Sequence, residues 1–289
     1  MERPDLEIRV SGRDTNFYYS FLVLPAEKRK AITAVWDFCR AVDDTGDEES
    51  ESAPFDGTEL RPHAGLTCWR EEVRRLYEAR EPATAQGDEL APYIKAFNLP
   101  RSAFDDLIDG VEMDLAQDRY ETFESLRQYC LHVASAVGLI CVEIFGYRDV
   151  HTRDYAIDLG IALQLTNIIR DIPEDLRRGR LYVPLEDMNR FECGEDDLRA
   201  GVVTDRVQAL LRFECDRAKA FYRKADEALP ALDARRLVAA RIMAAIYFEL
   251  LRSIERSGYD VFRRVVRVPR PKRAVIAAKV WTRGLVGLR

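Results

Sequence analysis

The sequence predicts an all-α protein folded as one domain over residues 1–289, and three observations support this prediction. Apolar residues recur every three or four positions through long segments, which places them on one face of a helix. The chain has 12 prolines and 15 glycines in 289 residues, so helix-interrupting residues are sparse. No segment alternates polar and apolar residues for long, and the most strand-like stretch, residues 181–184, is too short to build a sheet.

The apolar spacing predicts a series of helices joined by polar loops. In the first helix, Ile32, Val35 and Trp36 share one face. Residues 46–65 and 80–92 are polar, acidic and rich in turn-forming residues, so we expect loops there. Neither resembles a flexible tether between domains, which favours a single domain. The predicted helices cover residues 26–43, 66–79, 100–117, 122–146, 151–172, 201–228 and 233–257.

Composition and charge exclude several classes of protein. The net charge of −6 argues against a nucleic-acid partner, and a composition of 47% hydrophobic and 33% charged residues is that of a globular protein. Residues 1–14 are charged and lack the apolar core of a signal peptide. We find no run of about 18 or more apolar residues and expect no transmembrane helix. These observations predict a cytoplasmic protein.

The cysteines and histidines restrict the metal chemistry of the chain. No two of the six cysteines form a CxxC pair, and none lies near a histidine at the spacing of metal ligands. We therefore expect buried thiols in a reducing compartment. With three histidines in the chain, a histidine-based triad or a zinc site is disfavoured. Any bound metal should be a hard ion held by oxygen atoms.

The first acidic cluster follows an apolar helix in the stretch FCRAVDDTGDE, residues 38–48. Asp43 and Asp47 are four residues apart and share a helix face, which Arg40 joins. Like charges at this spacing destabilise a helix by about 0.2–0.5 kcal/mol, and a divalent cation such as Mg²⁺ would offset that cost. The alternative is a solvated, acidic helix end. The apolar residues before Asp43 weaken this alternative because they place its face beside the core.

The second acidic cluster recurs at steps of three and four residues along one predicted helix. Gln164, Asn167, Asp171 and Asp175 form a polar stripe on a helix that is otherwise apolar. Burying such a stripe without partners is costly, so it faces either bulk water or a cavity that holds ions. The surrounding apolar residues favour the cavity. The basic run that follows contains Arg177, Arg178 and Arg180.

Together the two clusters indicate Mg²⁺-assisted chemistry on a diphosphate. Arginine binds phosphate oxygens in a bidentate way, and a metal that neutralises a diphosphate makes it a better leaving group. If the rest of the cavity is apolar, the organic part of the substrate should be a hydrocarbon whose ionisation gives a carbocation. Aromatic faces stabilise such a cation. The candidate aromatic residues, for which a plain core role is the alternative, are Phe17, Tyr18, Trp36 and Tyr129.

These motifs resemble the squalene/phytoene synthase family of head-to-head prenyl synthases. The resemblance begins at NFYYSFLVLPAEKRKAITAVWDFCRAVDDTGDE and continues through GVEMDL and YCLHVASAVGLICVEIFG. It is strongest at LGIALQLTNIIRDIPEDLRRGRLYVPLEDM and covers nearly the whole chain. It implies the all-α isoprenoid synthase fold, in which helices surround a central apolar cavity and two acidic helices bind Mg²⁺.

The same resemblance implies a role for individual residues. The implied metal ligands are Asp43 and Asp47 in the first cluster and Asn167, Asp171 and Asp175 in the second. The implied catalytic residues are Arg40, Arg170 and Arg180 on the diphosphate, with Tyr129 and Gln164 beside the reacting carbons. The implied substrate-binding residues are Phe17, Trp36, Arg40, Val133, Gly138, Gln164, Asn167, Arg177 and Tyr247, with Gly138 as a small residue on a cavity helix.

Within the family, three stretches resemble most the bacterial presqualene diphosphate synthases of hopanoid biosynthesis. They are MDLAQDRYETFESL, YVPLEDMNRF and ERSGYDVFRRVVRVPRPKRAVIAAKVW. That subfamily joins two molecules of farnesyl diphosphate, with Mg²⁺, or Mn²⁺ in its place, assisting the departure of diphosphate from the donor. The double bond of the acceptor attacks the allylic cation, and loss of a proton closes a cyclopropane.

Further expectations come with this subfamily. The departing diphosphate serves as the base, with Tyr129 as a relay. The resemblance implies that NADPH is not required and that downstream enzymes of the squalene pathway are partners. Other activities remain open: a phytoene synthase that joins two geranylgeranyl diphosphates, or a synthase that continues to squalene or dehydrosqualene. A non-enzymatic assembly factor and a scaffold with solvated carboxylates are disfavoured, because both acidic motifs are intact and arginines flank them.

The sequence departs from the family pattern at three places. Trp36 and Asp37 stand where a Tyr-Ala pair is usual, and the larger Trp36 ring is expected to shorten the pocket. Gly46 lies inside the first acidic motif and should loosen that helix end. Pro173 lies between Asp171 and Asp175 and should kink or end the helix there, which would affect the placement of Asp175.

The last segment, residues 261–289, is basic and partly apolar. No Asp or Glu follows Asp260, whereas nine Arg and Lys residues alternate with apolar residues that include Trp281. One hypothesis is that this segment contacts anionic lipid on the inner face of a membrane. The alternative is a basic surface helix or a frayed tail.

Overall fold

The computed structural model describes residues 18–52 and 64–285, which form α-helices, one π-helical turn and no strand. The elements are α1 (Tyr18–Phe21), α2 (Ala26–Ser52), α3 (Ala64–Tyr77), α4 (Ala85–Ala96), α5 (Arg101–Ala116), α6 (Phe123–Cys130), η1 (Leu131–Ser135), α7 (Ala136–Phe145), α8 (Thr152–Arg177), α9 (Leu185–Arg190), α10 (Glu195–Arg199), α11 (Asp205–Ala228), α12 (Val238–Arg256) and α13 (Arg270–Leu285). The predicted all-α class is confirmed.

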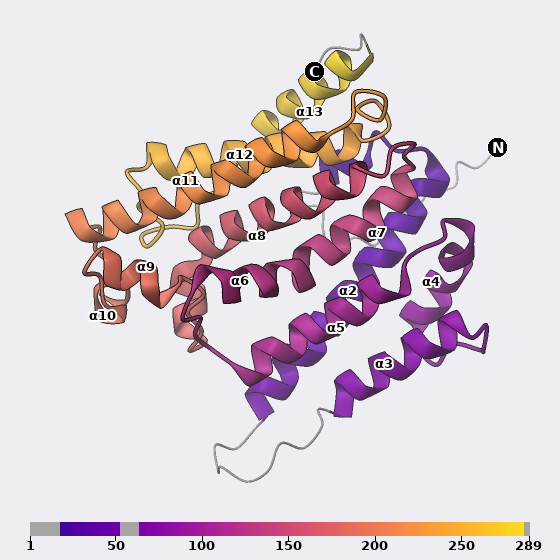
Figure 1. Ribbon diagram of the computed structural model, residues 1–289, viewed down its shortest axis with the longest axis horizontal. Coiled ribbons are helices and arrows are strands. Elements are labelled where there is room, and N and C mark those ends of the chain that lie inside the picture. The colour runs from indigo at the N-terminus through magenta and orange to yellow at the C-terminus, as the bar shows by residue number, and fades with distance from the viewer. Residues whose placement is uncertain (1–17, 53–63, 286–289) are drawn as a thin grey trace, which may run out of the picture.

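The long helix α8 lies at the centre of the bundle. It packs against α6, η1 and α7 on one side and against α11 and α12 on the other (Figure 1). The helices α2 and α5 pack together beyond α7, and α3 and α4 cover their outer side (Figure 1). This arrangement places the C-terminal half of α8 near the C-terminal half of α2, the two segments that carry the acidic clusters.

The helix α4 contradicts the prediction of a loop over residues 80–92. Thr84 caps its N-terminus, because the Thr84 hydroxyl oxygen accepts a hydrogen bond from the backbone N–H of Gly87 at 2.9 Å. Leu90 and Ile94, four residues apart, are buried against the bundle. Two buried positions in a polar segment give too weak a periodic signal to predict a helix. The short helices α9 and α10 were also not predicted.

The stretch Phe123–Phe145 runs through α6, η1 and α7, as the predicted helix over residues 122–146 implied. By length and composition it is apolar enough to cross a membrane, with a mean hydropathy of 1.5, contrary to the expectation that no such stretch exists. In the structure it packs against α5 and α8, and Ile140, Ile144 and Phe145 are buried. Its apolar character is therefore accounted for by its place in the bundle.

The prediction made for Gly46 was wrong, and Pro173 does not end its helix, whereas the kink predicted there stays a prediction. Gly46 lies inside α2, which continues to Ser52, and a Cβ atom there would lie 2.3 Å from Cγ1 of Val111. Glycine at this position allows α2 and α5 to approach closely, rather than loosening the helix. Pro173 lies inside α8, which continues to Arg177. The burial of Ile172 and Leu176 stabilises the last turn despite the lost hydrogen bond.

The cysteines are all free thiols. The expectation of burial holds for four of them, but Cys68 is exposed and Cys141 is half-buried. Burial raises the pKa of the Cys130 thiol and, to about 12, the pKa of Cys141. These two thiols are therefore protonated and unreactive at neutral pH.

Candidate active site

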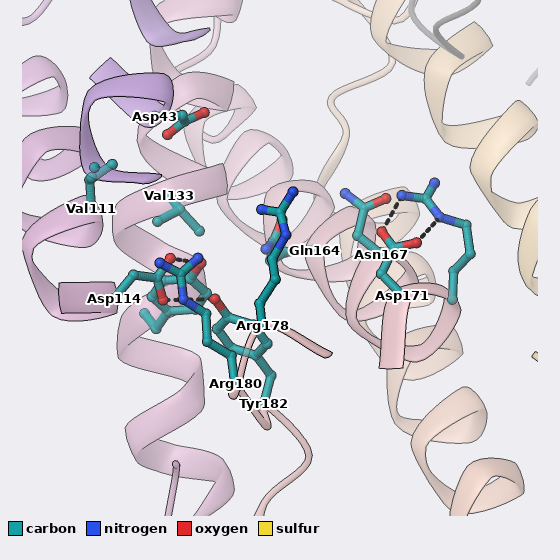
Figure 2. Close-up of a pocket in the computed structure, with 13 residues that line it drawn as sticks. Asp43, Val111, Asp114, Val133, Gln164, Asn167, Asp171, Arg178, Arg180 and Tyr182 are labelled. Atoms are coloured by element: carbon teal, nitrogen blue, oxygen red, sulfur yellow. Dashed lines mark hydrogen bonds and ion pairs between the residues drawn. The ribbon is translucent and has the colours of Figure 1, made fainter. Parts of the chain in front are cut away.

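A cavity of about 410 Å³ lies between α2, α5, the α6–η1 segment and α8. The segment that follows α8 closes one side of it (Figure 2). Most of its lining side chains carry charge or hydrogen-bonding groups, so the cavity is suited to a charged ligand. The lining residues are Asp43, Gly46, Val111, Asp114, Tyr129, Val133, Gln164, Asn167, Arg170, Asp171, Arg178, Arg180 and Tyr182.

The polar stripe of α8 faces this cavity. Gln164, Asn167 and Asp171 are successive residues of one helix face, and all three line the cavity. Neighbouring residues of α8, among them Ile168 and Ile172, are buried on other faces of the helix. These apolar contacts fix the rotation of α8 about its axis, and that rotation turns the stripe toward the cavity.

The acidic end of α2 reaches the same cavity from a separate helix. Asp43 lines it one residue after the fully buried Val42 (Figure 2). Asp47 is one helical turn further along α2, but its side chain lies outside the part of the structure that is described. Asp43 of α2 and Asn167 and Asp171 of α8 therefore line one cavity. The sequence predicted that these two helices bind metal ions through these residues.

Asp175 lies beside the cavity, and its raised pKa reflects the excess of negative charge there. Burial, together with the carboxylates of Asp171 and Asp114, raises the pKa of Asp175 to about 7. Arg180 and Arg178 counteract part of this rise. A carboxyl group whose pKa is raised by burial and by like charges is stabilised in its ionised form when a cation binds nearby.

The donor set of α8 fits a hard divalent cation. The Oδ1 atom of Asn167 is buried and has no hydrogen-bond partner among the described residues. A buried amide oxygen without a partner is costly, and coordination to a cation would satisfy it. With the carboxylates of Asp171, Asp175 and Asp43, the available ligand atoms are all oxygens, the type that Mg²⁺ and Mn²⁺ prefer.

A second group of possible metal ligands lies elsewhere, on α5 and η1. The ligand atoms of Asp106, Asp109 and His132 lie within 4.8 Å of one another. Asp109 is already paired with Arg70, whose Nη1 atom lies 2.7 Å from its Oδ1. A cation partner is therefore present in the protein itself, and this group does not line the cavity.

Asp114 is a functional candidate that the sequence did not reveal. It lines the cavity from α5 and accepts hydrogen bonds from the hydroxyl groups of Tyr129, at 2.7 Å, and Tyr182, at 2.8 Å. Tyr120 stacks on Tyr182, and the ring centroids of Tyr129 and Tyr182 are 5.2 Å apart. Burial and the Asp114 charge raise the pKa of Tyr129 well above its usual value, so Tyr129 is a neutral donor.

The arginines divide into those that face the cavity and those that do not. Arg170, Arg178 and Arg180 line it. Arg177, predicted to bind substrate, is instead exposed and donates to Glu174. Arg40, predicted to contact diphosphate, is half-exposed, and its Nε atom lies 3.7 Å from Asp44.

Arg170 is held by protein groups rather than left open to a ligand. Its Nε atom donates to Oδ1 of Asp171 at 2.7 Å, and it shares a hydrogen bond with the buried Tyr247. Arg170 therefore orients Asp171, and Tyr247 supports Arg170. Arg170 also lines the cavity, so the diphosphate contact predicted for Arg170 and the substrate contact predicted for Tyr247 stay predictions.

The remaining predicted residues are scattered around the cavity. Val133 lines it, whereas Trp36 is half-buried on α2, seven residues before Asp43. Gly138 does not line the cavity: a Cβ atom there would lie 2.9 Å from the carbonyl oxygen of Ala156, so it allows α7 to approach α8. Phe17 lies outside the described residues, and the Tyr18 side chain is also not described.

Two arginines joined by one carboxylate hold the end of α8. Glu195 of α10 accepts hydrogen bonds from Arg119, at 2.9 and 3.0 Å, and from Arg199. Arg119 also donates to the carbonyl oxygen of Gly179, and Arg199 donates to that of Leu176. These contacts satisfy carbonyl groups at the helix end and fix the direction in which the chain leaves α8.

The segment positioned in this way carries cavity residues. Gly179 has φ +81°, a conformation that favours glycine and ends the helix. The backbone N–H of Leu181 then donates to the carbonyl oxygen of Asp118 at 2.9 Å, which ties the segment to the residues after α5. Arg178, Arg180 and Tyr182 thereby reach the cavity, although none of them lies within α8.

Comparisons of the sequence and of the fold with known proteins find squalene, dehydrosqualene and phytoene synthases. The profile of the family described as Squalene/phytoene synthase matches residues 10–273. A 15-cis-phytoene synthase of Synechococcus elongatus is 38% identical over 268 residues, which cover 88% of this chain and 83% of that protein. A phytoene synthase of Mycobacterium bovis is 34% identical over 91% of this chain and 85% of its own length.

Two solved structures with similar folds are a dehydrosqualene synthase and a squalene synthase, whereas the relatives above are phytoene synthases. A dehydrosqualene synthase crystallised with a ligand superposes with a TM-score of 0.83, at 27% identity over 93% of this chain and 92% of that chain. The squalene synthase HpnC from Alicyclobacillus acidocaldarius gives a TM-score of 0.72 and 33% identity, over 85% of this chain and 89% of that chain.

Proposed function

Because this chain belongs to the squalene/phytoene synthase family, whose members are prenyltransferases, we propose that it joins two prenyl diphosphates head to head. One observation carries the proposal: acidic residues from α2 and α8 and the arginines that follow α8 line a single cavity. Such a cavity offers oxygen ligands for cations and guanidinium donors for phosphate oxygens side by side. The family resemblance predicted from the motifs is confirmed.

In this proposal Asp43, Asp47, Asn167, Asp171 and Asp175 hold divalent cations, Mg²⁺ or Mn²⁺. Cations bound there would neutralise the diphosphate and make it a better leaving group. The residues of the chain itself then bind and orient the substrates.

The arginines after α8 bind the diphosphate. Arg178 and Arg180 line the cavity opposite the acidic stripe, and their guanidinium groups donate to phosphate oxygens. Arg40, at the acidic end of α2, is half-exposed and is a further donor for a second diphosphate at the rim. Val133 and Gln164 contact the hydrocarbon chains where they enter the cavity.

Tyr129 and Asp114 handle the proton that must leave carbon after the new bond forms. The hydroxyl hydrogen of Tyr129 is engaged by Asp114, so the lone pairs of the Tyr129 oxygen remain to accept a proton. Asp114 takes up the phenolic hydrogen as Tyr129 accepts the new one, which makes the pair a relay. Departing diphosphate is the second base available in the same cavity.

The proposed substrate is farnesyl diphosphate, and the proposed products are presqualene diphosphate and diphosphate. The motifs near residues 113–126, 182–191 and 255–281 support this choice by their resemblance to presqualene diphosphate synthases. The structural similarity to a dehydrosqualene synthase and to the squalene synthase HpnC also supports it. Trp36, on the same face of α2 as Asp43, adds bulk where a longer hydrocarbon would extend.

A second candidate is phytoene synthesis from two geranylgeranyl diphosphates. The observation that favours it is the identity of 34–38% to phytoene synthases of Synechococcus elongatus and Mycobacterium bovis. These relatives match nearly the same share of the chain as the structural neighbours do, so coverage does not separate the two candidates.

A product analysis separates them. Purified protein is incubated with Mg²⁺ and farnesyl diphosphate without NADPH, with geranylgeranyl diphosphate in parallel, and products are analysed by mass spectrometry before and after phosphatase treatment. We expect a C30 diphosphate ester from farnesyl diphosphate. A C40 product from geranylgeranyl diphosphate alone would instead identify a phytoene synthase. No product from either substrate, together with Mg²⁺ binding that Asp171→Ala leaves unchanged, would contradict the proposed site.

A further inference from the structure

The helix α13 has one face in the core and the other in solvent. Ala277, with Ile276 and Val280 beside it, packs against Ile242 and Ile246 of α12. This contact covers one side of α13 and leaves it at the periphery of the bundle (Figure 1). Residues 270–285 therefore form a surface helix and not a frayed tail, which is compatible with both the lipid hypothesis and the surface-helix alternative.

The outer face of α13 combines exposed apolar and basic side chains. Val275 is 66% exposed and Trp281 is 45% exposed, with the exposed Ala278 between them at helical steps of three. Lys279 and Arg283, four residues apart, form a column beside this apolar strip. We call these five residues the α13 basic face. Large apolar side chains held in solvent at these positions are not required by the packing of α13.

The segment before α13 extends the same character. Val265 is 56% exposed, and Arg264 and Arg267 beside it are also exposed. None of the 50 acidic residues of the chain follows Asp260, whereas nine of its 44 basic residues do. Because the whole chain carries a net charge of −6, this segment is strongly basic relative to the rest of an acidic protein.

We propose that the α13 basic face docks the protein on an anionic lipid surface, with Val275 and Trp281 entering the headgroup region and the cations contacting phosphates. A helix that lies in a membrane interface has this division into apolar and basic strips. Tryptophan favours the interface because its ring is apolar and its N–H remains hydrated. The docking needs no substrate and does not rest on the proposed reaction.

Charge complementarity favours lipid over other partners. An anionic lipid surface satisfies both strips at once, because its phosphates attract Lys279 and Arg283 while its acyl boundary accepts Val275 and Trp281. A nucleic acid would neutralise the cations and leave Val275 and Val265 in water. A second copy of the chain would supply acidic groups, and the test below identifies that outcome.

Cosedimentation of the full-length protein with vesicles tests the proposal. The vesicles contain phosphatidylcholine with about one third phosphatidylglycerol, or phosphatidylcholine alone, at low and high salt. We expect binding to the anionic vesicles at low salt, weakening with added salt, and little binding to neutral vesicles. The emission of Trp281 should shift to shorter wavelength on binding, because Trp36 is half-buried and Trp69 buried in the free protein.

Charge reversal with a matched control makes the test specific. Each cation near an anionic surface raises the partition coefficient onto the vesicles about fivefold. The double variant Lys279→Glu with Arg283→Glu should therefore lower that coefficient by at least about 25-fold. The control, Lys95→Glu with Arg223→Glu, changes the net charge equally at exposed positions of α4 and α11 and should keep most of the binding. Trp281→Phe should abolish the emission shift.

Any of three results would overturn the proposal, two of them in the binding assay and one in the oligomeric state. The first two are equal binding of the two double variants, and no binding of the parent protein to anionic vesicles at low salt. The third is concentration-dependent dimerisation without lipid that Lys279→Glu with Arg283→Glu prevents, which would assign the α13 basic face to self-association. Enzymatic activity in solution is expected to be unchanged in these variants, so failure here is distinguishable from failure of the proposed function.

Discussion

Two clusters of acids and arginines lie along neighbouring helices and differ in whether protein groups satisfy all of their charges. In the Arg217 cluster, between α9 and α11, Arg217 donates to Asp187 at 2.7 Å and to Glu214 at 2.8 Å. The guanidinium group also lies between the rings of Phe123, at 4.2 Å, and Phe213, at 4.7 Å. Protein groups surround the charges on every described side, and none of these residues lines the cavity.

The cavity cluster, formed by Asn167, Asp171 and Asp175 with Arg178 and Arg180, is incomplete by comparison. The Oδ1 atom of Asn167 has no partner among the described residues, and about 410 Å³ of space adjoins it. Raised pKa values do not separate the clusters, because burial raises the pKa of both Asp175 and Glu214 to about 7. The open space and the unsatisfied oxygen do separate them, and they mark the cluster that needs a ligand.

The largest expected effect is on activity, at the cavity cluster. Asp171→Asn removes a carboxylate from the proposed metal site and should lower kcat/KM by about 10³-fold, as loss of a key electrostatic group does. Stability should change less than at the Arg217 cluster, because the lost pair with Arg170 is partly offset by the relief of repulsion between Asp171 and Asp175. Steady-state kinetics and urea unfolding measure the two effects. Asp154→Asn, in the exposed first turn of the same helix and outside the cavity, is the control and should retain activity.

At the Arg217 cluster the same kind of change should act on stability instead. Arg217→Met leaves Asp187 and Glu214 buried without a cation, and breaking such a buried pair costs about 3–5 kcal/mol. Urea unfolding measures this loss. The exposed Arg212→Met on the same helix is the matched control and should unfold like the parent. If Arg217→Met kept its stability but lost kcat at low temperature, the Arg217 cluster would be assigned to catalysis. That result would contradict the distinction between the two clusters.

The adjacent residues Arg177 and Arg178, at the end of α8, test at single-residue scale whether a side chain must line the cavity to affect activity. Arg178→Ala should lower kcat/KM by about 10²-fold, because Arg178 lines the cavity and is a proposed donor to the diphosphate. Arg177→Ala should leave it almost unchanged, because Arg177 does not line the cavity, although both arginines pair with Glu174. Kinetics of the two variants under identical conditions check this. Equal losses would mean that the segment rearranges when substrate binds.

Glu214 gives the Arg217 cluster a predictable pH dependence. Burial, and then Asp187, raise its pKa from 4.5 to about 7, so the folded protein holds a proton there that the unfolded chain releases near pH 4.5. Its contribution to stability is complete below pH 4.5 and is lost as the pH rises through 7. Glu214→Gln cannot ionise, so it does not lose this contribution. As the pH rises from 4.5 through 7, the free energy of unfolding of the parent should therefore fall by about 3 kcal/mol more than that of Glu214→Gln.

Unfolding by urea at pH values from 4.5 to 7.5 measures this difference. Identical slopes for Glu214→Gln and the parent would mean that Arg217 keeps Glu214 ionised throughout. Glu255→Gln, an acid of α12 paired with Lys219 nearer the surface, is the comparison variant and should follow the parent.

The smallest expected effect concerns the contacts that position the end of α8. Glu195→Gln weakens the hold of Arg119 and Arg199 on the carbonyl groups of Gly179 and Leu176. Misplacement of Arg178 and Arg180 should lower kcat by about tenfold with little change in stability. Asp196→Asn, the neighbouring acid on α10, is the control. An effect on KM alone would assign Glu195 to substrate access rather than to positioning.

Local sequence patterns were enough to predict the all-α class and the polar stripe of α8. Gln164, Asn167 and Asp171 lie on one face because α-helical geometry repeats every 3.6 residues, and that requires nothing from the rest of the chain. The same local geometry put Asp43 at the end of an apolar helix. These predictions depend on neighbours three or four residues away, and such neighbours can be seen in a sequence.

The other half of the cavity depends on contacts between segments that are far apart in the sequence. Asp114 gains its role from Tyr129 and Tyr182, which are 15 and 68 residues away along the chain. Which arginine faces the cavity depends on where α8 ends and on how Glu195 holds that end, so Arg177 was predicted where Arg178 is found. Contacts between distant segments are set by the packing of whole helices, and local periodicity carries no information about them.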